Sequence, residues 1–345
     1  MTRLRPSSPR SVLRRPAFWL GLLLLAGLAL AAWINLATPA RLFDRSGARV
    51  AVLPAAAPFL AGQRVLVLAP HPDDETLCCA GMIQQAQAAG AQVYVAWMTA
   101  GDGFEFDAAL TERTLRPGAQ AMRTLGNTRV AETRQAAAAL GVARDHTYML
   151  GYPDGGLFRL FTTNYASAFT SPRTRANAVY VTGALTPGAP FTGQALEADI
   201  TRVLDRVQPD LVLAPAPQDF HPDHHTLSYI ALQLMSRRAQ ADRLRYWVVH
   251  GGLEWPVPKG LHEGLALTEP PLADRLPWTR VDLSPEQRTR KLEAVRAYRT
   301  QTEIEPRFME AFVRANELLS PEPLPEVGSA SNTAEGQDEG QTNQP

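Results

Sequence analysis

Short, dense apolar runs separated by helix-length segments constrain the fold of this chain more than any other feature. The first run is Val65 to Leu68, and the second is Val93 to Met98. Later runs are Tyr148 to Leu150, Leu211 to Ala214 and Tyr246 to Val249. Runs this short and this apolar are typical of strands that are buried on both faces of a sheet.

The segments between these runs favour helices. We predict helices at Glu75–Ala89, Val130–Leu140, Ala195–Val207 and His224–Arg238, the first two being followed by the helix-stopping glycines Gly90 and Gly141. Strands that alternate with helices indicate an α/β fold, here a Rossmann-like, mostly parallel sheet with helices on both faces. In such a sheet, ligand sites lie beyond the carboxyl ends of the strands.

An uncharged apolar segment near the N-terminus has the length of a membrane span. It runs from Ala17 to Ala37, with Trp19 and Trp33 near its ends, and a helix needs roughly 20 apolar residues to cross a bilayer. The arginines before it are Arg3, Arg5, Arg10, Arg14 and Arg15, and those after it are Arg41, Arg45 and Arg49, partly offset by Asp44. The positive-inside rule therefore predicts a single-pass anchor with a cytoplasmic N-terminus and the rest of the chain outside the cytoplasm.

The competing interpretation of this segment is a cleaved signal peptide. Its apolar stretch is long for that role, and Pro39 interrupts the small residues around Ala37 to Ala40. We predict five parts of the chain: a basic segment (1–16), the anchor (17–37), a linker (38–62), one folded domain (63–319) and a tail (320–345). The tail is rich in Pro, Ser, Gly, Asn, Gln and acidic residues, a composition that predicts disorder.

Charge and cysteine content add little about function. The 34 basic and 34 acidic residues cancel, so no basic patch supports nucleic-acid binding. The two cysteines, Cys78 and Cys79, are adjacent, and neighbouring residues rarely reach disulfide geometry without strain. We therefore expect two small, buried, apolar side chains.

Two loops at predicted strand ends carry most of the chemistry. The first strand continues into Pro70-His71-Pro72-Asp73-Asp74-Glu75, and a later one into Gln218-Asp219-Phe220-His221-Pro222-Asp223-His224-His225. Four of the seven histidines lie in these two loops. Each loop repeats a three-residue spacing, His71 to Asp74 and His221 to His224, which puts both side chains on one side of a first helical turn.

Imidazole and carboxylate groups are ordinary zinc ligands, and a catalytic zinc usually takes three of them. Four candidates for three places leave one residue for acid–base work. Asp73 and Asp223 are further carboxylates that could take a proton from water or orient a histidine. Taken alone, a His-Pro-Asp run is weak, because an aspartate there often only caps the following helix.

The two loops resemble the signatures of the N-acetylglucosaminyl-phosphatidylinositol deacetylase family, also called PIG-L or LmbE-like. Further similar segments are Arg129 to Glu132 with Leu140-Gly141, the loop Gly151 to Leu157, and Lys291, Ala294 and Gln301. The resemblance covers about Gln63 to Leu319.

The resemblance implies that His71, Asp74 and His224 hold one zinc ion, or another divalent metal such as Fe²⁺. It implies that Asp73 is the general base on the attacking water, and that His221 stabilises the oxyanion and helps to protonate the leaving amine. Asp223 would orient His221. Arg129 and Asp154 match positions that contact the sugar.

The implied activity is a metal-dependent N-deacetylase that removes acetyl from an N-acetylglucosamine-type amino sugar and releases acetate. The acceptor could be a glycolipid, an envelope glycan or a sugar conjugate, and the predicted export favours the first two. The alternatives are another metal hydrolase, such as a phosphoesterase or peptidase, and a carbohydrate-binding protein that keeps the fold without catalysis. Two-metal hydrolases use more carboxylates than this chain offers.

Two features leave the role of single residues open. The stretch between Gly156 and Gly193 carries Phe158, Phe161, Tyr165, Phe169 and Tyr180, and it could be a wall for a sugar or a packed insertion. His225 should point away from His224 and act as a supporting or surface residue. The isolated histidines, His146, His250 and His262, are predicted to be structural.

Overall fold

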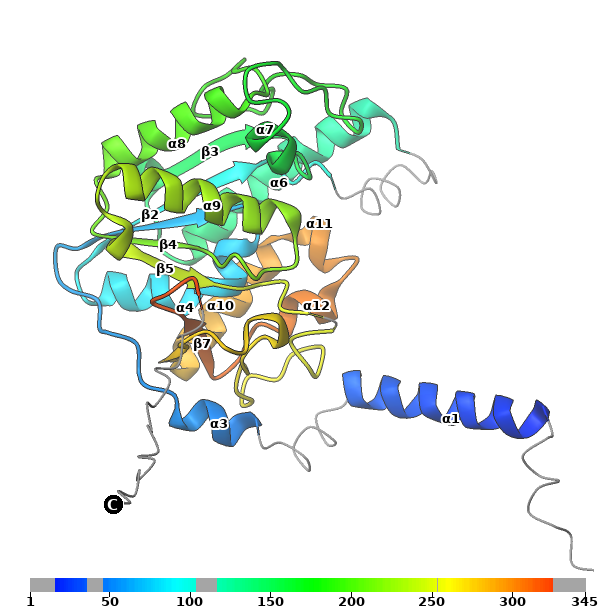
Figure 1. Cartoon of the computed structure of the whole chain (residues 1–345). Coiled ribbons are helices and arrows are strands. Elements are labelled where there is room, and N and C mark those ends of the chain that lie inside the picture. Colours follow the sequence, from blue (N-terminus) through cyan, green and yellow to red (C-terminus); the bar gives the residue numbers. More distant parts are fainter. Residues whose placement is uncertain (1–15, 36–45, 104–116, 253, 325–345) are drawn as a thin grey trace, which may run out of the picture.

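A five-stranded sheet forms the centre of the protein in the computed structural model, which describes residues 16–35, 46–103, 117–252 and 254–324 (Figure 1). Its strand order is β3-β2-β1-β4-β5, and every neighbouring pair is parallel. The strands are β1 (Arg64–Ala69), β2 (Gln92–Thr99), β3 (Thr147–Tyr152), β4 (Leu211–Pro215) and β5 (Leu244–Trp247). The predicted α/β fold with a mostly parallel sheet is confirmed.

Helices cover both faces of this sheet. The helices α4 (Asp74–Ala88) and α6 (Ala119–Ala139) follow β1 and β2, while α8 (Gly193–Val207) and α9 (Pro222–Arg237) follow β3 and β4. Figure 1 shows α8 and α9 together on one face, with α4 and α6 on the other. Successive strands are added on one side of β1 up to β3 and then on its other side from β4, so the strand order reverses between the parallel neighbours β1 and β4. Open α/β sheets place their ligand sites at such a point.

The predicted elements match the observed ones closely, except for α6. That helix begins at Ala119, about three turns before the predicted start at Val130. Its first half contains Gly126 and is polar on its outer side, and only Met122 and Leu125 are its buried hydrophobic residues there. A weak apolar stripe of this kind gives little periodicity to detect.

A C-terminal layer packs against α4 and α6. It contains α10 (Pro285–Ala297), α11 (Arg299–Thr302), α12 (Pro306–Glu310) and an antiparallel pair, β6 (Thr279–Asp282) with β7 (Asn316–Leu319). The remaining elements are short: α3 (Ser46–Val52), α7 (Leu157–Phe161), and the 3-10 turns η2 (Arg144–His146), η3 (Ala241–Arg243) and η4 (Pro271–Ala273).

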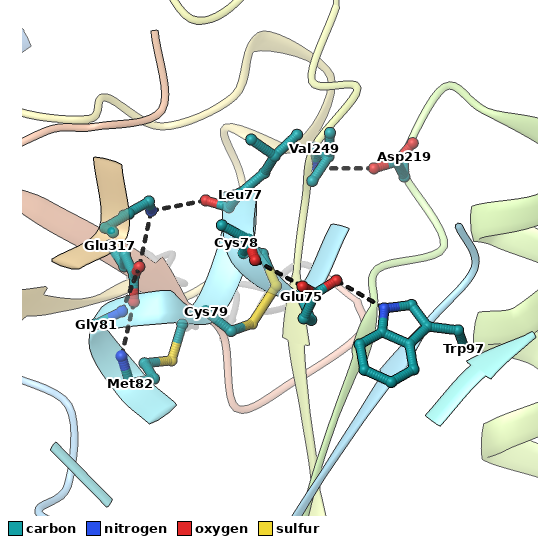
Figure 2. The surroundings of a disulfide bond; sticks show 12 residues. Glu75, Leu77, Cys78, Cys79, Gly81, Met82, Trp97, Asp219, Val249 and Glu317 are labelled. Atoms are coloured by element: carbon teal, nitrogen blue, oxygen red, sulfur yellow. Dashed lines mark hydrogen bonds and ion pairs between the residues drawn. A yellow bond between two sulfur atoms is a disulfide. The ribbon is translucent and has the colours of Figure 1, made fainter. Parts of the chain in front are cut away.

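A buried ion pair ties this layer to α4 (Figure 2). Glu317 accepts hydrogen bonds from the backbone N–H groups of Gly81 and Met82 at 2.8 and 2.9 Å. Lys291 Nζ lies 2.8 Å from Glu317 and also donates to the carbonyl of Leu77 at 2.8 Å. Because a Cβ on Gly81 would lie 2.6 Å from Leu283, glycine is the residue that allows this close approach.

The expectation that the two cysteines are unpaired is wrong. Cys78 and Cys79 lie within α4 and are joined by a disulfide bond (Figure 2). Both side chains are buried as predicted. Sequence reasoning treated the adjacent spacing as prohibitive, but the two sulfur atoms are bonded in the structure.

The segment between the anchor and the sheet has more structure than the predicted linker. The helix α3 lies within it, and Val50 on this helix is buried. Ala56 donates to the carbonyl of Arg280 at 2.9 Å, and Arg280 donates to the carbonyl of Pro54 at 2.9 Å. Residues 46–62 therefore contact the edge of the domain. Residues 325–345 of the predicted tail lie outside the described part of the chain.

The predicted anchor forms one apolar helix, α1 (Pro16–Asn35). Its 18-residue segment Phe18–Asn35 is long and apolar enough to cross a membrane, and none of it is buried inside the protein. A signal sequence would have the same properties.

Candidate active site

The loops after all five strands of the sheet converge on one pocket of about 300 Å³, the loop after β2 through Gly103. His71 and Asp73 follow β1, Asp154 follows β3, His221 follows β4, and His250 follows β5. The C-terminal layer closes the pocket with Gln301, Glu305, Phe308 and Met309. This volume is at the lower end of small-molecule sites, which span roughly 300–1,000 Å³.

The β1–α4 junction holds its side chains through backbone contacts. Asp74 is the first residue of α4, and its Oδ2 accepts a hydrogen bond from the backbone N–H of His71 at 2.8 Å. Asp73 precedes the helix with a φ of 110°, a value rare for residues other than glycine. Such strained backbone is maintained where the surrounding structure demands it, often at functional sites.

Three predicted ligand atoms meet at one point. His71 Nδ1 lies 3.3 Å from Asp74 Oδ2 and 3.2 Å from His224 Nε2. His224 Nε2 lies 3.2 Å from Asp74 Oδ2. Ligands about 2.0–2.1 Å from a tetrahedral zinc ion lie roughly 3.4 Å from one another, so this set fits a zinc ion or a metal of similar size.

The other nitrogen of each histidine faces a carboxylate. His71 Nε2 lies 3.2 Å from Asp223 Oδ2, and His224 Nδ1 lies 3.1 Å from Asp219 Oδ2. If each outer nitrogen carries the proton, the inner nitrogens present their lone pairs to the shared point. Carboxylate–histidine pairs of this kind orient the ligands of zinc sites.

Buried carboxylates govern the charge of this centre. Burial lowers the pKa of His224, but Asp219 and Asp74 outweigh it and raise that pKa to about 9. Burial alone would raise the pKa of Asp74, but His224 and His71 hold it well below its usual range. The arrangement therefore favours a positive charge at the shared point, which a proton or a metal cation can supply.

Asp73 lies beside the three ligand atoms without joining them. Gln301 Nε2 donates a hydrogen bond to Asp73 Oδ2, and Arg129 approaches the same oxygen at 3.9 Å. Burial, and then the negative charge of Asp74, raise the pKa of Asp73 well above its usual range. A carboxyl with a raised pKa can accept a proton near neutral pH.

His221 presents one nitrogen to the pocket in a defined state. Its Nδ1 accepts a hydrogen bond from the backbone N–H of Asp223 at 3.2 Å, so the neutral ring carries its proton on Nε2. Burial, and then the neighbouring His71, His224 and His250, lower the pKa of His221 to about 2. His221 is therefore a neutral hydrogen-bond donor.

In the structure, the carboxylate of Asp223 faces partners other than the predicted His221. Its carboxylate contacts His71, as described above, and accepts hydrogen bonds from the backbone N–H groups of Gly155 and Leu157 at 2.7 and 3.0 Å. Only its backbone N–H reaches His221. The first turn of α9 points this side chain towards the β1 and β3 loops, which the spacing within one loop cannot reveal.

Two site residues were missed from the sequence. Asp219 accepts from the backbone N–H groups of His221, Val249 and His250 at 3.0, 2.9 and 3.0 Å, so it joins the β4 and β5 loops. His250 was predicted to be structural, but it lines the pocket, and its ring centroid is 4.8 Å from that of His224. A position just beyond the β5 run was the available signal.

Alternative ligand sets overlap with the central one. His221 groups with His71 and His224, and His250 groups with Asp74 and His224, each with ligand atoms within 4.8 Å of one another. A third set is His71, Asp154 and Asp223. In the set His71, Asp74 and His224, the ligand atoms lie 3.2 to 3.3 Å from one another, and each histidine keeps a carboxylate on its outer nitrogen.

The two predicted sugar-contacting residues both line the pocket. Arg129 is largely engaged by the protein, since it donates to the carbonyls of Gly101 and Pro72 at 2.6 and 3.1 Å. Asp154 accepts from the backbone N–H of Gly103 at 3.0 Å and lies 3.4 Å from His71 Nε2. Its pKa lies below the usual range, because His71 and Arg129 outweigh the effect of burial.

The stretch between Gly156 and Gly193 packs partly against the domain and is partly exposed. Leu160 and Phe191 are fully buried, while Phe158 is 53% exposed. Arg173 extends from it to the pocket wall. Of the other histidines, His225 is half-buried, His146 stacks on Tyr94, and His262 contacts the carbonyl of Lys259.

Known proteins resemble this chain over most of its length. Residues 66–235 match the family PIG-L, described as GlcNAc-PI de-N-acetylase. The 1D-myo-inositol 2-acetamido-2-deoxy-alpha-D-glucopyranoside deacetylase of Saccharomonospora viridis is 30% identical over 76% of this chain and 92% of its own length. The enzyme of the same name from Actinosynnema mirum is 30% identical over 70% of this chain and 81% of its own.

A solved structure of the A40926 pseudoaglycone deacetylase Dbv21 aligns with 75% of this chain and 97% of its own, at 20% identity and a TM-score of 0.48. The named relatives are deacetylases, which are hydrolases of amide bonds. With the family match and the 30% identity to a relative covered almost end to end, the chain belongs to the PIG-L family of deacetylases.

Proposed function

We propose that this protein is a zinc-dependent hydrolase that removes the acetyl group from an N-acetylglucosamine-type amino sugar and releases acetate. The observation that carries the proposal is the meeting of three ligand atoms from His71, Asp74 and His224, with a carboxylate behind each histidine. Zinc is the metal that this mixed nitrogen and oxygen set suits best, and Fe²⁺ is the alternative.

When bound, the metal would polarise the acetyl carbonyl and lower the pKa of an attacking water towards roughly 7. The chain's own groups carry the remaining steps. Asp73 accepts the proton from the water, since its pKa is raised and it lines the pocket beside the ligands. His221 donates its Nε2–H to the oxyanion that forms when the carbonyl is attacked.

The proton for the leaving amine then comes from Asp73. A neutral His221 with a low pKa is a poor source, because losing the Nε2 proton would leave an imidazolate. Protonated Asp73 is stabilised by burial and can pass the same proton to the amine nitrogen. This differs from the role in amine protonation that the family resemblance implied for His221.

The sugar would occupy the pocket that these residues line. We propose that Asp154 and Arg129 both contact it, with Asp154 accepting a hydrogen bond from a sugar hydroxyl. Arg129 would also hold Asp73 in place through its charge. Asp223 and Asp219 would act on the ligands His71 and His224 respectively.

The test is incubation of the zinc-loaded protein with candidate N-acetylated amino sugars. Mass spectrometry should show the loss of one acetyl group, and a coupled assay should show one acetate released per free amine. Acetate release that is unchanged by Asp73→Asn, or no release from any N-acetylated sugar tested, would contradict the proposal.

We also propose that α1 is an uncleaved anchor and that the residues after it lie outside the cytoplasm. The support is the arginine excess before Ala17 and the apolar helix itself, of which no part is buried inside the protein. Reporter fusions after residue 37 and at the C-terminus test the topology. Activity of a cytoplasm-only reporter at the C-terminus would reverse it, and loss of an N-terminal tag from the mature protein would indicate cleavage.

A further inference from the structure

The C-terminal end of α1 is attached to the domain beside the catalytic pocket. The backbone N–H of Lys259 donates to the carbonyl of Ile34 at 2.7 Å. Arg307 donates to the side chain and the carbonyl of Asn35, both at 3.1 Å. If α1 is a membrane anchor, its attachment here determines which side of the domain faces the membrane.

A groove of about 1,040 Å³ runs between α1 and the domain. Its wall on α1 is formed by Gly27, Leu30, Ala31 and Ile34, and its apolar wall on the domain by Phe220, Trp255, Leu272 and Phe308. His250, Glu305 and Phe308 line both this groove and the catalytic pocket. The groove and the pocket are therefore neighbours that share a wall.

The helix geometry gives the length of this groove along α1. Gly27 precedes Asn35 by eight residues, which is about 12 Å along a helix axis. If α1 crosses a bilayer, the domain residues opposite Gly27 to Ile34 reach the boundary between headgroups and acyl chains. Two of them expose apolar surface, since Phe220 is 74% and Leu272 is 48% exposed.

Charged groups lie at the end of the groove where headgroups would be. Lys259 and Arg307 bind the last residues of α1, and Lys259 Nζ is 4.5 Å from the centre of the Phe308 ring. Glu254 lies 4.0 Å from Lys259, and Glu305 is exposed. Cationic side chains beside an apolar surface are typical of segments that lie at a lipid interface.

We propose that this groove is a bilayer-contact surface, in which lipid acyl chains cover the exposed Phe220 and Leu272 and the partly buried Phe308. The catalytic pocket then opens at the level of the lipid headgroups. This rests on the proposed anchoring by α1 and on its continuity with the groove. It does not depend on the reaction that the pocket catalyses.

The experiment uses the full chain in nanodiscs of phosphatidylcholine and phosphatidylglycerol, with and without a lipid spin-labelled at carbon 5 of its acyl chain. Phe220→Cys and Leu272→Cys are labelled with a fluorophore whose emission shifts to the blue in apolar surroundings. Phe158→Cys is the matched control, because Phe158 is 53% exposed on α7, far from α1 in Figure 1. The native cysteines are buried and paired, so the unsubstituted protein is the labelling blank.

We expect blue-shifted emission at positions 220 and 272, and quenching of that emission by the spin-labelled lipid. Neither change is expected at position 158. Water-like, unquenched emission at 220 and 272 in an anchored protein would overturn the proposal, as would a blue shift without quenching, which would indicate a protein partner. Loss of the N-terminal tag would overturn it together with the anchor. Acetate release from a soluble N-acetylated sugar, measured on the same sample, reports separately on the proposed reaction.

Discussion

Asp219 provides a sharp test of how the site is held together, since its carboxylate takes part in four polar contacts. It accepts from three backbone N–H groups at 2.9 to 3.0 Å and lies 3.1 Å from His224 Nδ1. Asp219→Asn keeps the shape but turns one oxygen into an NH₂ group. At least one N–H group then faces another donor, and the remaining bonds lose their negative acceptor.

The expected magnitude follows from these contacts. Loss of one buried hydrogen bond to a charged group costs about 1.5–3 kcal/mol of folding stability. Loss of the carboxylate behind a histidine ligand weakens metal binding about 10- to 100-fold, or about 1.4–2.7 kcal/mol. The pKa of Asp219 lies below its usual range, because His224 and His250 outweigh the effect of burial. Its stabilisation should therefore be present above about pH 4, its unfolded pKa, and be lost as pH falls further.

The assay is competition with a chelator for zinc, combined with thermal unfolding of the metal-free protein. Asp210→Asn is the matched control, because Asp210 pairs with Arg64 at the surface and such pairs contribute about 0–1 kcal/mol. If Asp219→Asn kept the zinc affinity and the melting temperature of the unsubstituted protein, the proposed support of His224 would be refuted.

Three further predictions concern the buried polar groups. Lys291→Met leaves the Glu317 carboxylate buried without its partner. Urea unfolding should show that it destabilises the protein by about 3–5 kcal/mol. The control is Arg296→Met, which removes one partner of an exposed ion pair on the same helix and should cost less than about 1 kcal/mol. His221→Ala should lower kcat about 100- to 1,000-fold, because the oxyanion loses a hydrogen-bond donor, while the zinc content stays at one per chain. Loss of zinc from this variant would place His221 among the ligands instead. In the metal-free protein the pKa of His224 is raised to about 9. The protonated ring therefore stabilises the fold fully below about pH 6.5, the pKa in the unfolded chain, and this stabilisation is lost as pH rises through about 9. After chelation the melting temperature should fall over that range, and an unchanged melting temperature would contradict the charge arrangement.

Much of the fold and part of the site were accessible from the sequence, because the governing signals are local. The runs at Val65–Leu68 and Leu211–Ala214 are buried on both faces of the sheet, so they contain almost no polar residue. The His-Asp and His-His spacings lie within single loops, and parallel strands bring the loop ends to one edge. These facts were sufficient to bring His71, Asp74, His221 and His224 together as candidates, and the family resemblance then selected three of them as ligands.

The remaining contacts join segments that are far apart in the sequence, which no local pattern encodes. Asp223 contacts His71 across 152 positions, and Gln301 reaches Asp73 across 228. His250 has no motif around it, and only the pairing of β4 with β5 brings it beside His224. The disulfide in α4 was missed for a different reason, since its spacing was treated as prohibitive.

Asp73→Asn tests the central claim most directly, because it separates the general base from the metal ligands. Zinc content and acetate release should be measured on the same sample, with Asp74→Asn as the comparison. The account predicts one zinc per chain, a folded protein and turnover lowered about 100- to 10,000-fold for Asp73→Asn, whereas Asp74→Asn should lose zinc. Wild-type turnover in Asp73→Asn, or loss of its zinc, would contradict the assignment of these two aspartates.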